Sequence, residues 1–196
     1  MATFKNGDLP PRTSRSKIIE NYDQLTQAAS GLRAVGYRIV VTIGSWDLLH
    51  IGHLRYLIKA KECGDILIVG VDTDRGVKLY KGPSRPVVPQ VERCEMLTYQ
   101  AAVDFVTLVD DIDEQGRWQY GLIKAVRPDV FVAVEGSYPP EQIAEIEKYS
   151  NHVTVLPRQA EETSTSHFVQ VTVKRQLLDK LQVIRKVLEE IERERL

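Results

Sequence analysis

Five short apolar runs occur along the chain, separated by longer stretches whose apolar residues recur at helical spacing. Continuous apolar runs of this kind are typical of strands that are buried on both faces of a sheet. The alternation of strand and helix predicts an α/β fold, in which helices cover both faces of a doubly wound, five-stranded parallel sheet. The strands are expected at 39–43, 65–71, 104–109, 129–134 and 152–157.

Helical spacing fills most of the chain between these strands. Helices are expected at 18–35, 51–62, 90–102, 116–126 and 139–149, and a basic loop is expected from 72 to 85. Because the carboxyl ends of parallel strands meet at one edge of a sheet, we expect ligand-binding residues in the loops that follow the strands.

Three segments are expected along the chain. Residues 1–16, rich in Pro, Ser, Arg and Gly, are predicted to form a flexible leader, residues 17–172 a globular domain and residues 173–196 a C-terminal helical extension. A long final helix is expected to begin near Ser166. Its apolar residues recur at alternating four- and three-residue steps, as in a coiled-coil seam: Leu177, Leu181, Ile184, Leu188 and Ile191. This seam fits either packing against the chain's own domain or pairing with a second subunit.

The composition narrows the class of protein. The 196 residues carry a net charge of −1 and give a sequence pI of about 6.4, so the sequence lacks the strong basic bias of a nucleic-acid-binding protein. No apolar stretch approaches the length of a membrane span, and the polar N-terminal stretch has no secretory apolar region. Two isolated cysteines, Cys63 and Cys94, are expected to be reduced core residues. These features predict a cytoplasmic protein without nucleic-acid or membrane partners.

The loop after the first predicted strand carries the most specific motif, GSWDLLHIGH at 44–53. His50 and His53 are three residues apart, so on a helix they share a face. Near a helix N-terminus, where free N–H groups favour anions, two imidazoles can donate hydrogen bonds to phosphate oxygens. Gly52 leaves room for a phosphate to approach closely, and Gly44 does the same for a nucleotide.

This loop resembles the G-x-x-D-x-x-H-x-G-H signature of the cytidylyltransferase-like nucleotidyltransferases, which include glycerol-phosphate cytidylyltransferase and the bacterial heptose-phosphate adenylyltransferases. The resemblance covers about residues 17–170 and implies a Rossmann-like nucleotidyltransferase fold and a homodimer. It also implies that His50 and His53 are catalytic, binding the triphosphate and stabilising the transition state. The other motif positions are then expected to contact the nucleotide: Gly44, Ser45, Trp46, Asp47 and Gly52.

Basic residues follow the second predicted strand. The stretch VKLYKGPSRPVVP resembles the V-K-x-x-K-G-x-x-R-P-V segment of the heptose-phosphate adenylyltransferases. The resemblance implies a catalytic role for Lys78 and phosphate or acceptor binding by Lys81 and Arg85. Arg93, near the start of the next predicted helix, matches a family arginine and is expected to bind the nucleotide.

Two further segments bear on the substrates. The late S-T-T motif of the family matches Ser164, Thr165 and Ser166, which implies contacts to the nucleotide phosphates, and Arg158 lies just upstream. The sugar-phosphate branch reads V-K-G-G-D-Y after the fourth strand, whereas this chain reads VAVEGSY, with Glu135 and no lysine. We therefore expect an acceptor other than heptose phosphate, bound near Glu135 and Arg158.

The resemblance implies transfer of a nucleoside monophosphate from CTP or ATP to a small phosphorylated acceptor, such as a sugar or polyol phosphate, with release of pyrophosphate. Mg²⁺ is expected to be carried with the triphosphate, and Asp47 is the candidate protein ligand. Two alternatives keep the same binding edge. One is an adenylyltransferase acting on a nicotinamide, pantetheine or flavin precursor, and the other is a non-catalytic nucleotide sensor.

Overall fold

The structure of the chain, a computed structural model, describes residues 17–160 and 164–194, and the side chains of Ser166 and of residues 187–194 lie outside this description. The predicted leader, 1–16, also lies outside the described residues. The chain divides into two compact units, Met1–Gln159 and Ala160–Leu196, and the predicted catalytic loop belongs to the first.

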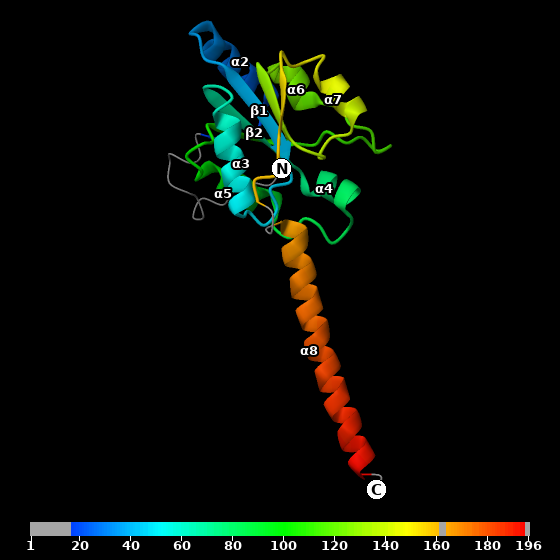
Figure 1. The fold of residues 1–196 in the computed structure, drawn as a ribbon. Coiled ribbons are helices and arrows are strands. Elements are labelled where there is room, and N and C mark those ends of the chain that lie inside the picture. The colour runs from blue at the N-terminus through cyan, green and yellow to red at the C-terminus, as the bar shows by residue number, and fades with distance from the viewer. Residues whose placement is uncertain (1–16, 161–163, 195–196) are drawn as a thin grey trace, which may run out of the picture. The chain divides into compact units, whose positions relative to one another are not determined.

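The first unit is built on a sheet of five parallel strands in the order β3-β2-β1-β4-β5 (Figure 1). This confirms the doubly wound parallel sheet that the sequence predicts. The order changes direction between β1 and β4, and ligands of open parallel sheets bind beside such a switch point, at the carboxyl ends of the strands. The strands are β1 (Ile39–Gly44), β2 (Ile66–Asp72), β3 (Phe105–Val109), β4 (Val130–Val134) and β5 (Val153–Leu156).

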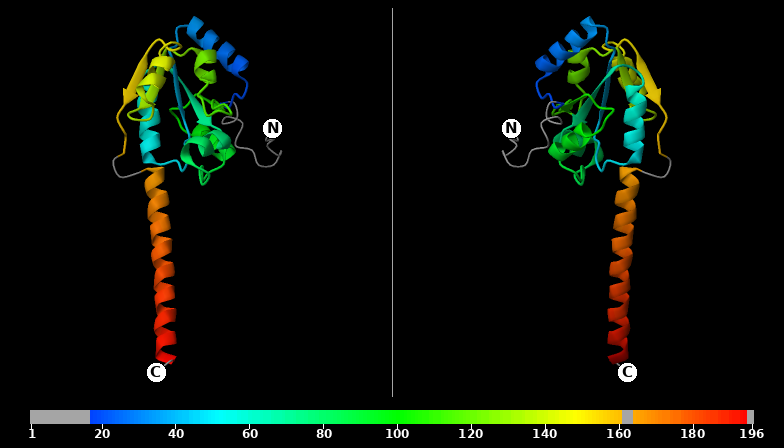
Figure 2. Two further views of the ribbon diagram at one scale, coloured as in Figure 1. Left: turned by 90° about the vertical axis from the view of Figure 1, so that its right-hand side faces the viewer. Right: turned by 90° about the vertical axis from the view of Figure 1, so that its left-hand side faces the viewer.

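Helices cover both faces of this sheet because alternate strand residues point to opposite sides. In β1, Val40 belongs to one hydrophobic core, while Ile39 and Val41 belong to the other. Helices α3 (Ile51–Lys61) and α5 (Gln90–Thr98) contribute to the core with Val40. The opposite core is formed by α2 (Tyr22–Ala34), α6 (Gly121–Val126) and α7 (Pro140–Ile146). Figure 2 shows α2 and α3 on opposite sides of the sheet.

The stretch predicted as a basic loop after β2 contains a helix, so that prediction was wrong. Helix α4 spans Asp74–Lys81. Its first turn is capped by Thr73, whose Oγ1 accepts a hydrogen bond from the Gly76 N–H at 3.1 Å. Val77 is buried beneath the helix, and Gly82, with φ of 93°, ends it. The basic residues of this stretch therefore stand on a defined scaffold.

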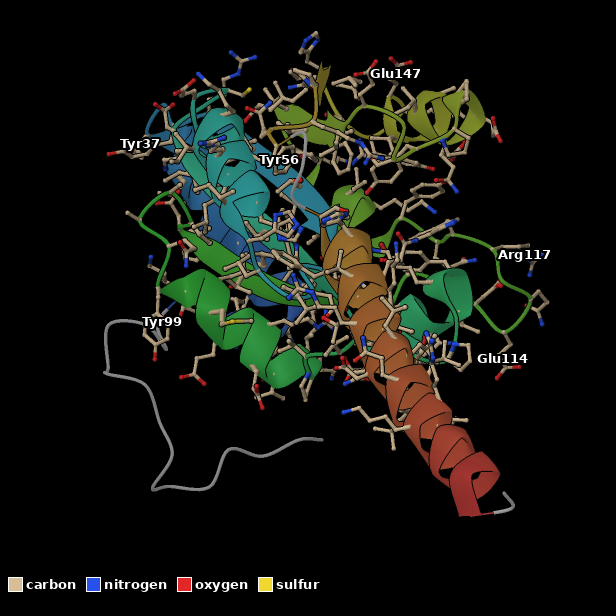
Figure 3. The ribbon with its side chains drawn as sticks, turned by 60° about the horizontal axis from the view of Figure 1, so that its bottom comes forward. Tyr37, Tyr56, Tyr99, Glu114, Arg117 and Glu147 are labelled. Carbon is tan, nitrogen blue, oxygen red and sulfur yellow. The ribbon has the colours of Figure 1, made fainter. Side chains whose placement is uncertain are left out.

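The helix predicted at 116–126 is shorter than expected. Helix α6 begins at Gly121, where the N–H donates to Oδ1 of Asp111 at 2.9 Å, and Tyr120 directly before it has a left-handed φ of 57°. The preceding loop instead carries Glu114 and Arg117 out at the periphery, as Figure 3 shows. The helix start is thus set by a carboxylate at the end of β3, which helical spacing alone does not reveal.

Helix α8 (Thr165–Glu194) makes up most of the second unit and runs for 30 residues. It begins one residue before the predicted start. Within the part of the chain that the structure describes, none of the helices combines the length and apolarity needed to cross a membrane.

Candidate active site

The sheet is loosely joined at its switch point. Strand β1 pairs with β2 along its whole length but with β4 only through Val40↔Val130 and Val41↔Phe131. Beyond these pairs a tyrosine takes over the hydrogen bonding. The hydroxyl of Tyr56, on α3, donates to the Val132 carbonyl at 2.8 Å (Figure 3 labels Tyr56). The Oγ1 of Thr42, on β1, lies 2.7 Å from the same hydroxyl. The parting strands place the loop after β1 beside the crevice that parallel sheets use for ligands.

The loop after β1 holds a tight, partly left-handed path. Trp46 and Leu48 have φ values of 52° and 48°, a region that non-glycine residues rarely occupy. The buried Trp46 indole donates from Nε1 to the Gly70 carbonyl of β2 at 2.8 Å. A Cβ atom at Gly44 would meet this indole at 3.4 Å. That is an ordinary van der Waals distance, so the Trp46 ring does not require a glycine at position 44, and Trp46 anchors the loop to the neighbouring strand.

The two motif histidines stack at the start of α3, and we refer to His50 and His53 as the histidine pair. Their ring centroids lie 3.9 Å apart with planes inclined by 25°. His50 is the N-cap of α3, and its Nδ1 accepts from the Gly52 N–H at 3.1 Å. An accepting Nδ1 places the proton of the neutral ring on Nε2. The two imidazoles thus lie together at the helix start, although His50 precedes α3 with extended backbone and does not stand on its face as predicted.

His53 carries an unusual polar atom. Its Nδ1 is buried and has no hydrogen-bond partner among the described residues. Trp46 packs against its ring, with centroids 5.5 Å apart in an edge-to-face arrangement. Burial, with smaller effects from His50 and Lys81, lowers the pKa of His53 to about 3, and burial also lowers the pKa of His50. Both imidazoles are therefore neutral near pH 7.

Asp47, the acidic position of the motif, is fully buried and faces the loop that follows α4. Its Oδ2 accepts from Arg85 Nε at 2.7 Å, and its two oxygens accept from the N–H groups of Val87 and Val88 at 2.9–3.0 Å. Burial alone would raise the pKa of this carboxyl, but the bonds from Val88 and Val87 and the Arg85 charge hold it below its ordinary value. The carboxylate thus fixes one loop against another.

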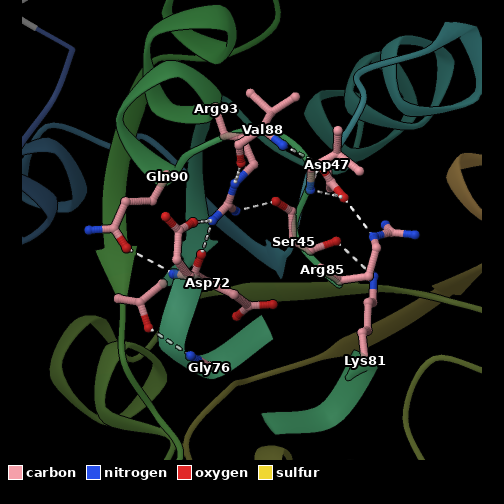
Figure 4. A network of polar contacts seen from close by, with 12 residues as sticks. Ser45, Asp47, Asp72, Gly76, Lys81, Arg85, Val88, Gln90 and Arg93 are labelled. Atoms are coloured by element: carbon pink, nitrogen blue, oxygen red, sulfur yellow. Dashed lines mark hydrogen bonds and ion pairs between the residues drawn. The ribbon is translucent and has the colours of Figure 1, made fainter. Parts of the chain in front are cut away.

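Arg93 makes a second set of such contacts and is fully buried (Figure 4). Its Nε donates to the Val88 carbonyl at 2.9 Å, and Nη2 donates to the Asp72 carbonyl at 2.8 Å and to Asp74 Oδ1 at 2.6 Å. Its Nη1 donates to the Ser45 carbonyl. One guanidinium therefore joins the loop after β1 to the end of β2 and the start of α4. We call Asp47, Arg85 and Arg93 the arginine–aspartate network.

These contacts bear on the predicted ligands of Asp47 and Arg93. Both side chains were expected to contact the nucleotide, and Asp47 was the candidate Mg²⁺ ligand, yet both are enclosed by protein groups. Mg²⁺ binds oxygen atoms that have a lone pair available, and both oxygens of the Asp47 carboxylate already accept hydrogen bonds. Among the described residues, no group of three or more His, Cys, Asp or Glu side chains is placed to hold a metal ion. Asp47 therefore does not fit the metal role.

Two lysines extend the site onto α4. Lys81 Nζ donates to Ser45 Oγ at 2.7 Å, in the loop of the histidine pair. Burial and the nearby Arg85 lower the pKa of this ammonium, while Asp72 and Asp47 oppose the shift. Lys78 stands three residues earlier on the same helix and is exposed. Both lysines are exposed, but Lys81 also reaches the histidine loop through its bond to Ser45.

The remaining predicted residues follow β4 and β5. Glu135 is exposed at the end of β4, and its N–H donates to the Leu156 carbonyl at 2.8 Å. Arg158 is exposed two residues after β5. Ser164 belongs to the second unit, where its Oγ accepts from the His167 N–H at 3.1 Å and caps α8. Thr165 begins that helix, and the Ser166 side chain lies outside the described residues.

Sequence reasoning missed one contact at this edge. Tyr80, on α4, donates its hydroxyl to Oδ2 of the buried Asp72 at 2.5 Å, and its ring packs against Trp118 with centroids 5.7 Å apart. A tyrosine eight residues after an aspartate carries no motif, so only the helical path of α4 could have revealed the pair. It supports the helix that presents Lys81.

The fold and the site together define a class of protein. It is a parallel α/β protein with stacked imidazoles and a lysine gathered at the carboxyl edge of its first strand. Residues 41–189 match the family described as cytidylyltransferase-like, and the chain belongs to that family. This confirms the family resemblance of the histidine motif.

Curated relatives agree with the match. The chain is 40% identical over 127 residues to "Bifunctional protein HldE" of Nitratiruptor sp., which is 65% of this chain and 26% of that protein. It is 39% identical over 142 residues to the HldE protein of Methylobacillus flagellatus, covering 69% and 27% of the two chains. The chain therefore spans little more than a quarter of the length of these relatives.

Solved structures share the fold. One is the lipopolysaccharide core biosynthesis protein of Thermoplasma volcanium, with a TM-score of 0.51 and 24% identity over 63% of this chain and 97% of that one. Another is the pantoate-beta-alanine ligase of Francisella tularensis, with a TM-score of 0.52 and 15% identity over 74% and 67% of the two chains. At these identities the likeness concerns the fold alone.

Proposed function

We propose that the chain transfers a nucleoside monophosphate from CTP or ATP to a small phosphorylated acceptor and releases pyrophosphate. The observation that carries this proposal is the histidine pair: two stacked neutral imidazoles at a helix start, one with a buried, unpartnered Nδ1. A buried polar atom without a partner costs free energy, so a ligand that supplies a partner is favoured. Helix N-termini favour anions, which makes the triphosphate the fitting ligand.

The reaction needs little covalent help from the protein. An oxygen of the acceptor phosphate attacks the α-phosphorus, a new P–O bond forms, and the bond to the bridging oxygen breaks as pyrophosphate leaves. The attacking oxygen is already anionic, so no general base is required. Catalysis then rests on positioning and on offsetting the charge that builds up on the phosphoryl oxygens.

The chain's own residues divide this work. The histidine pair would donate to the phosphates at the start of α3, and their pKa values would rise as the anion arrives because an adjacent opposite charge favours the protonated ring. Lys81, held beside Ser45, and the exposed Lys78 would offset further phosphate charge. Mg²⁺ is proposed to arrive with the triphosphate rather than on Asp47, whose oxygens are engaged.

A sugar or polyol phosphate other than heptose phosphate is the proposed acceptor. The HldE relatives and the basic residues of α4 favour a phosphorylated sugar-like compound. The loop after β4 presents an exposed carboxylate, Glu135, at a position where the sugar-phosphate branch of the family has a glycine that follows a lysine. A competition assay should offer heptose 1-phosphate beside glycerol and ribitol phosphates, each with CTP and with ATP. Clear preference for heptose 1-phosphate would overturn the acceptor assignment while leaving nucleotidyl transfer in place.

The histidine pair provides the test of the reaction itself. His53→Ala is expected to reduce the rate of pyrophosphate release by about 10²-fold or more, the scale for losing one donor to the transition state. The thermal unfolding midpoint should change little, because the packing lost with the ring is offset by removal of an unpartnered buried polar atom.

His152→Ala is the matched control for this test. His152 is an exposed histidine just before β5, at the opposite edge of the sheet. This variant should keep the wild-type rate. Equal rates for both variants would refute the catalytic assignment, and triphosphate binding without pyrophosphate release from any acceptor would favour the sensor.

A further inference from the structure

A hollow opens at the amino ends of the strands, at the edge of the sheet opposite the candidate active site. Its volume is about 630 Å³, within the range of sites that hold small molecules. It is lined by the end of α2 with the loop into β1, by the residue before β4 and by the two residues before β5. We call it the amino-edge hollow, and its lining side chains are those of Arg33, Tyr37, Arg38, Asp129, Asn151 and His152.

The carboxylate among these side chains, that of Asp129, is already engaged. Its Oδ2 accepts from Arg33 Nε at 3.2 Å and from the Ile39 N–H at 2.8 Å. Its Oδ1 accepts from Asn151 Nδ2 at 3.2 Å. Arg33 also donates from Nη2 to two backbone carbonyls at the end of α6. The charges of Arg33 and Asp129 therefore offset each other, and both side chains hold the fold together.

Three other lining side chains are hydrogen-bond donors that the protein leaves available. Tyr37, Arg38 and His152 are exposed, and their side chains make no hydrogen bond or ion pair within the part of the chain that the structure describes (Figure 3 labels Tyr37). Because the Arg33 charge is offset, the Arg38 guanidinium gives the hollow a net positive charge. The hollow thus offers a cation and several donors, while its carboxylate is occupied.

We propose that the amino-edge hollow binds a small phosphorylated ligand through its phosphate group. Phosphate oxygens accept hydrogen bonds from guanidinium, imidazole and phenol groups, and a guanidinium can bind two of these oxygens at once. A phosphate presents three terminal oxygens, so donors from different chain segments can share it, whereas the two oxygens of a carboxylate lie in one plane. This second site does not depend on the proposed reaction.

The position of the hollow gives such a ligand a structural effect. Arg38 directly precedes β1, and His152 directly precedes β5. Strand β1 pairs with β4 through only two residue pairs, which lie toward this end of the strands. A phosphate held by both side chains therefore bridges the short β1–β4 junction at the end opposite the histidine pair, and it should stabilise the folded chain.

Phosphate titration of the full-length chain, followed by NMR of the histidine rings, tests the site. The probe is inorganic phosphate at constant pH, and sodium chloride at the same ionic strength is the reference. The ring signals of His152 are identified by their loss in His152→Gln, which separates this site from phosphate bound at the histidine pair. They should shift in a saturable manner with phosphate and should not do so with chloride.

Arg38→Gln removes the charge and should raise the half-saturating phosphate concentration by about tenfold, the scale for losing one charged hydrogen-bond partner. Arg175→Gln is the matched control, because Arg175 is an exposed arginine of the second unit, and it should leave the titration unchanged. Equal half-saturation in Arg38→Gln and the wild type would overturn the proposal. Phosphate-dependent shifts confined to the histidine pair, with His152 unaffected, would also overturn it.

Discussion

Two groups of polar side chains lie at the carboxyl edge of the sheet, and they differ in how far the protein satisfies them. In the arginine–aspartate network, Asp47 and Arg93 are fully buried and spread their hydrogen bonds over four chain segments. In the histidine pair, His53 keeps a buried Nδ1 without a partner. Asp47 and Arg93 are therefore satisfied by protein groups alone, whereas His53 is not.

This difference separates the residues that hold the site together, the arginine–aspartate network, from those proposed to act on the substrate, the histidine pair. The sequence motif presents Asp47 and His53 as equal members of one signature. In the structure Asp47 has a structural role, because its carboxylate bonds the loop after β1 to the loop after α4. A substitution in the network should therefore act on stability first, whereas one in the histidine pair should act on turnover first.

The largest expected effect is on stability. Asp47→Ala should lower the free energy of unfolding by about 3–5 kcal/mol, since it leaves the buried Arg85 without its counter-charge and two N–H groups without an acceptor. Urea unfolding monitored by circular dichroism measures the change. Glu62→Ala, which removes an exposed partner of Lys59, is the control and should cause no resolvable loss. A similar, small effect of both substitutions would contradict the structural role of the arginine–aspartate network.

A smaller effect concerns the pH dependence of stability. The pKa of His53 is about 3 in the folded chain, against 6.5 for the ordinary residue. Between these values the unfolded chain binds a proton that the folded chain does not, so the free energy of unfolding falls as the pH drops below 6.5. At pH 5 the loss attributable to His53 is about 2 kcal/mol.

His53→Gln should remove this loss. Unfolding free energies of the wild type and the variant are compared at pH 8 and pH 5, with His152→Gln as the exposed control. The His53 variant should lose less stability on acidification than either of the other two chains. An identical loss in all three would mean that His53 is protonated in the folded state.

The smallest expected effect is on substrate binding at the rim of the site. Lys78→Ala should raise the KM for the phosphorylated substrates by about twofold to fivefold, the scale of one solvent-screened ionic contact. Steady-state pyrophosphate release provides the measurement, and Lys59→Ala, on the exposed face of α3, serves as the control. Unchanged constants for both substrates would leave Lys78 as a solvated helix charge.

Local patterns predicted most of the fold. Each strand is a continuous apolar run, so all five were placed within two residues, and the closeness of the two histidines, though not their stacking, followed from their spacing at a helix start. Helix α4 escaped prediction because its eight residues include glycine and only two apolar side chains that could mark a buried face, Val77 and Leu79. Its first turn also depends on Gln90, which accepts from the Asp74 N–H across 16 positions.

The roles of the network could not be read in the same way. Asp47 meets Arg85 and Val88 across about forty positions of sequence, and Arg93 reaches back to Ser45 across 48. Such contacts exist only once β1, β2 and α5 are packed together. A motif names the residue types that a site needs, but it does not show which of them face the ligand.

The two-pair junction between β1 and β4 has a mechanical consequence. It divides the sheet into one part formed by β1, β2 and β3 and another formed by β4 and β5. The substrates are proposed to bind along the line where these two parts meet. There the Tyr56 hydroxyl joins the two parts through one side-chain hydrogen bond to the Val132 carbonyl, which can break without disrupting backbone strand pairing. We expect a bound triphosphate to shift the two parts of the sheet relative to each other at this junction, so that the sheet itself adapts to the substrate.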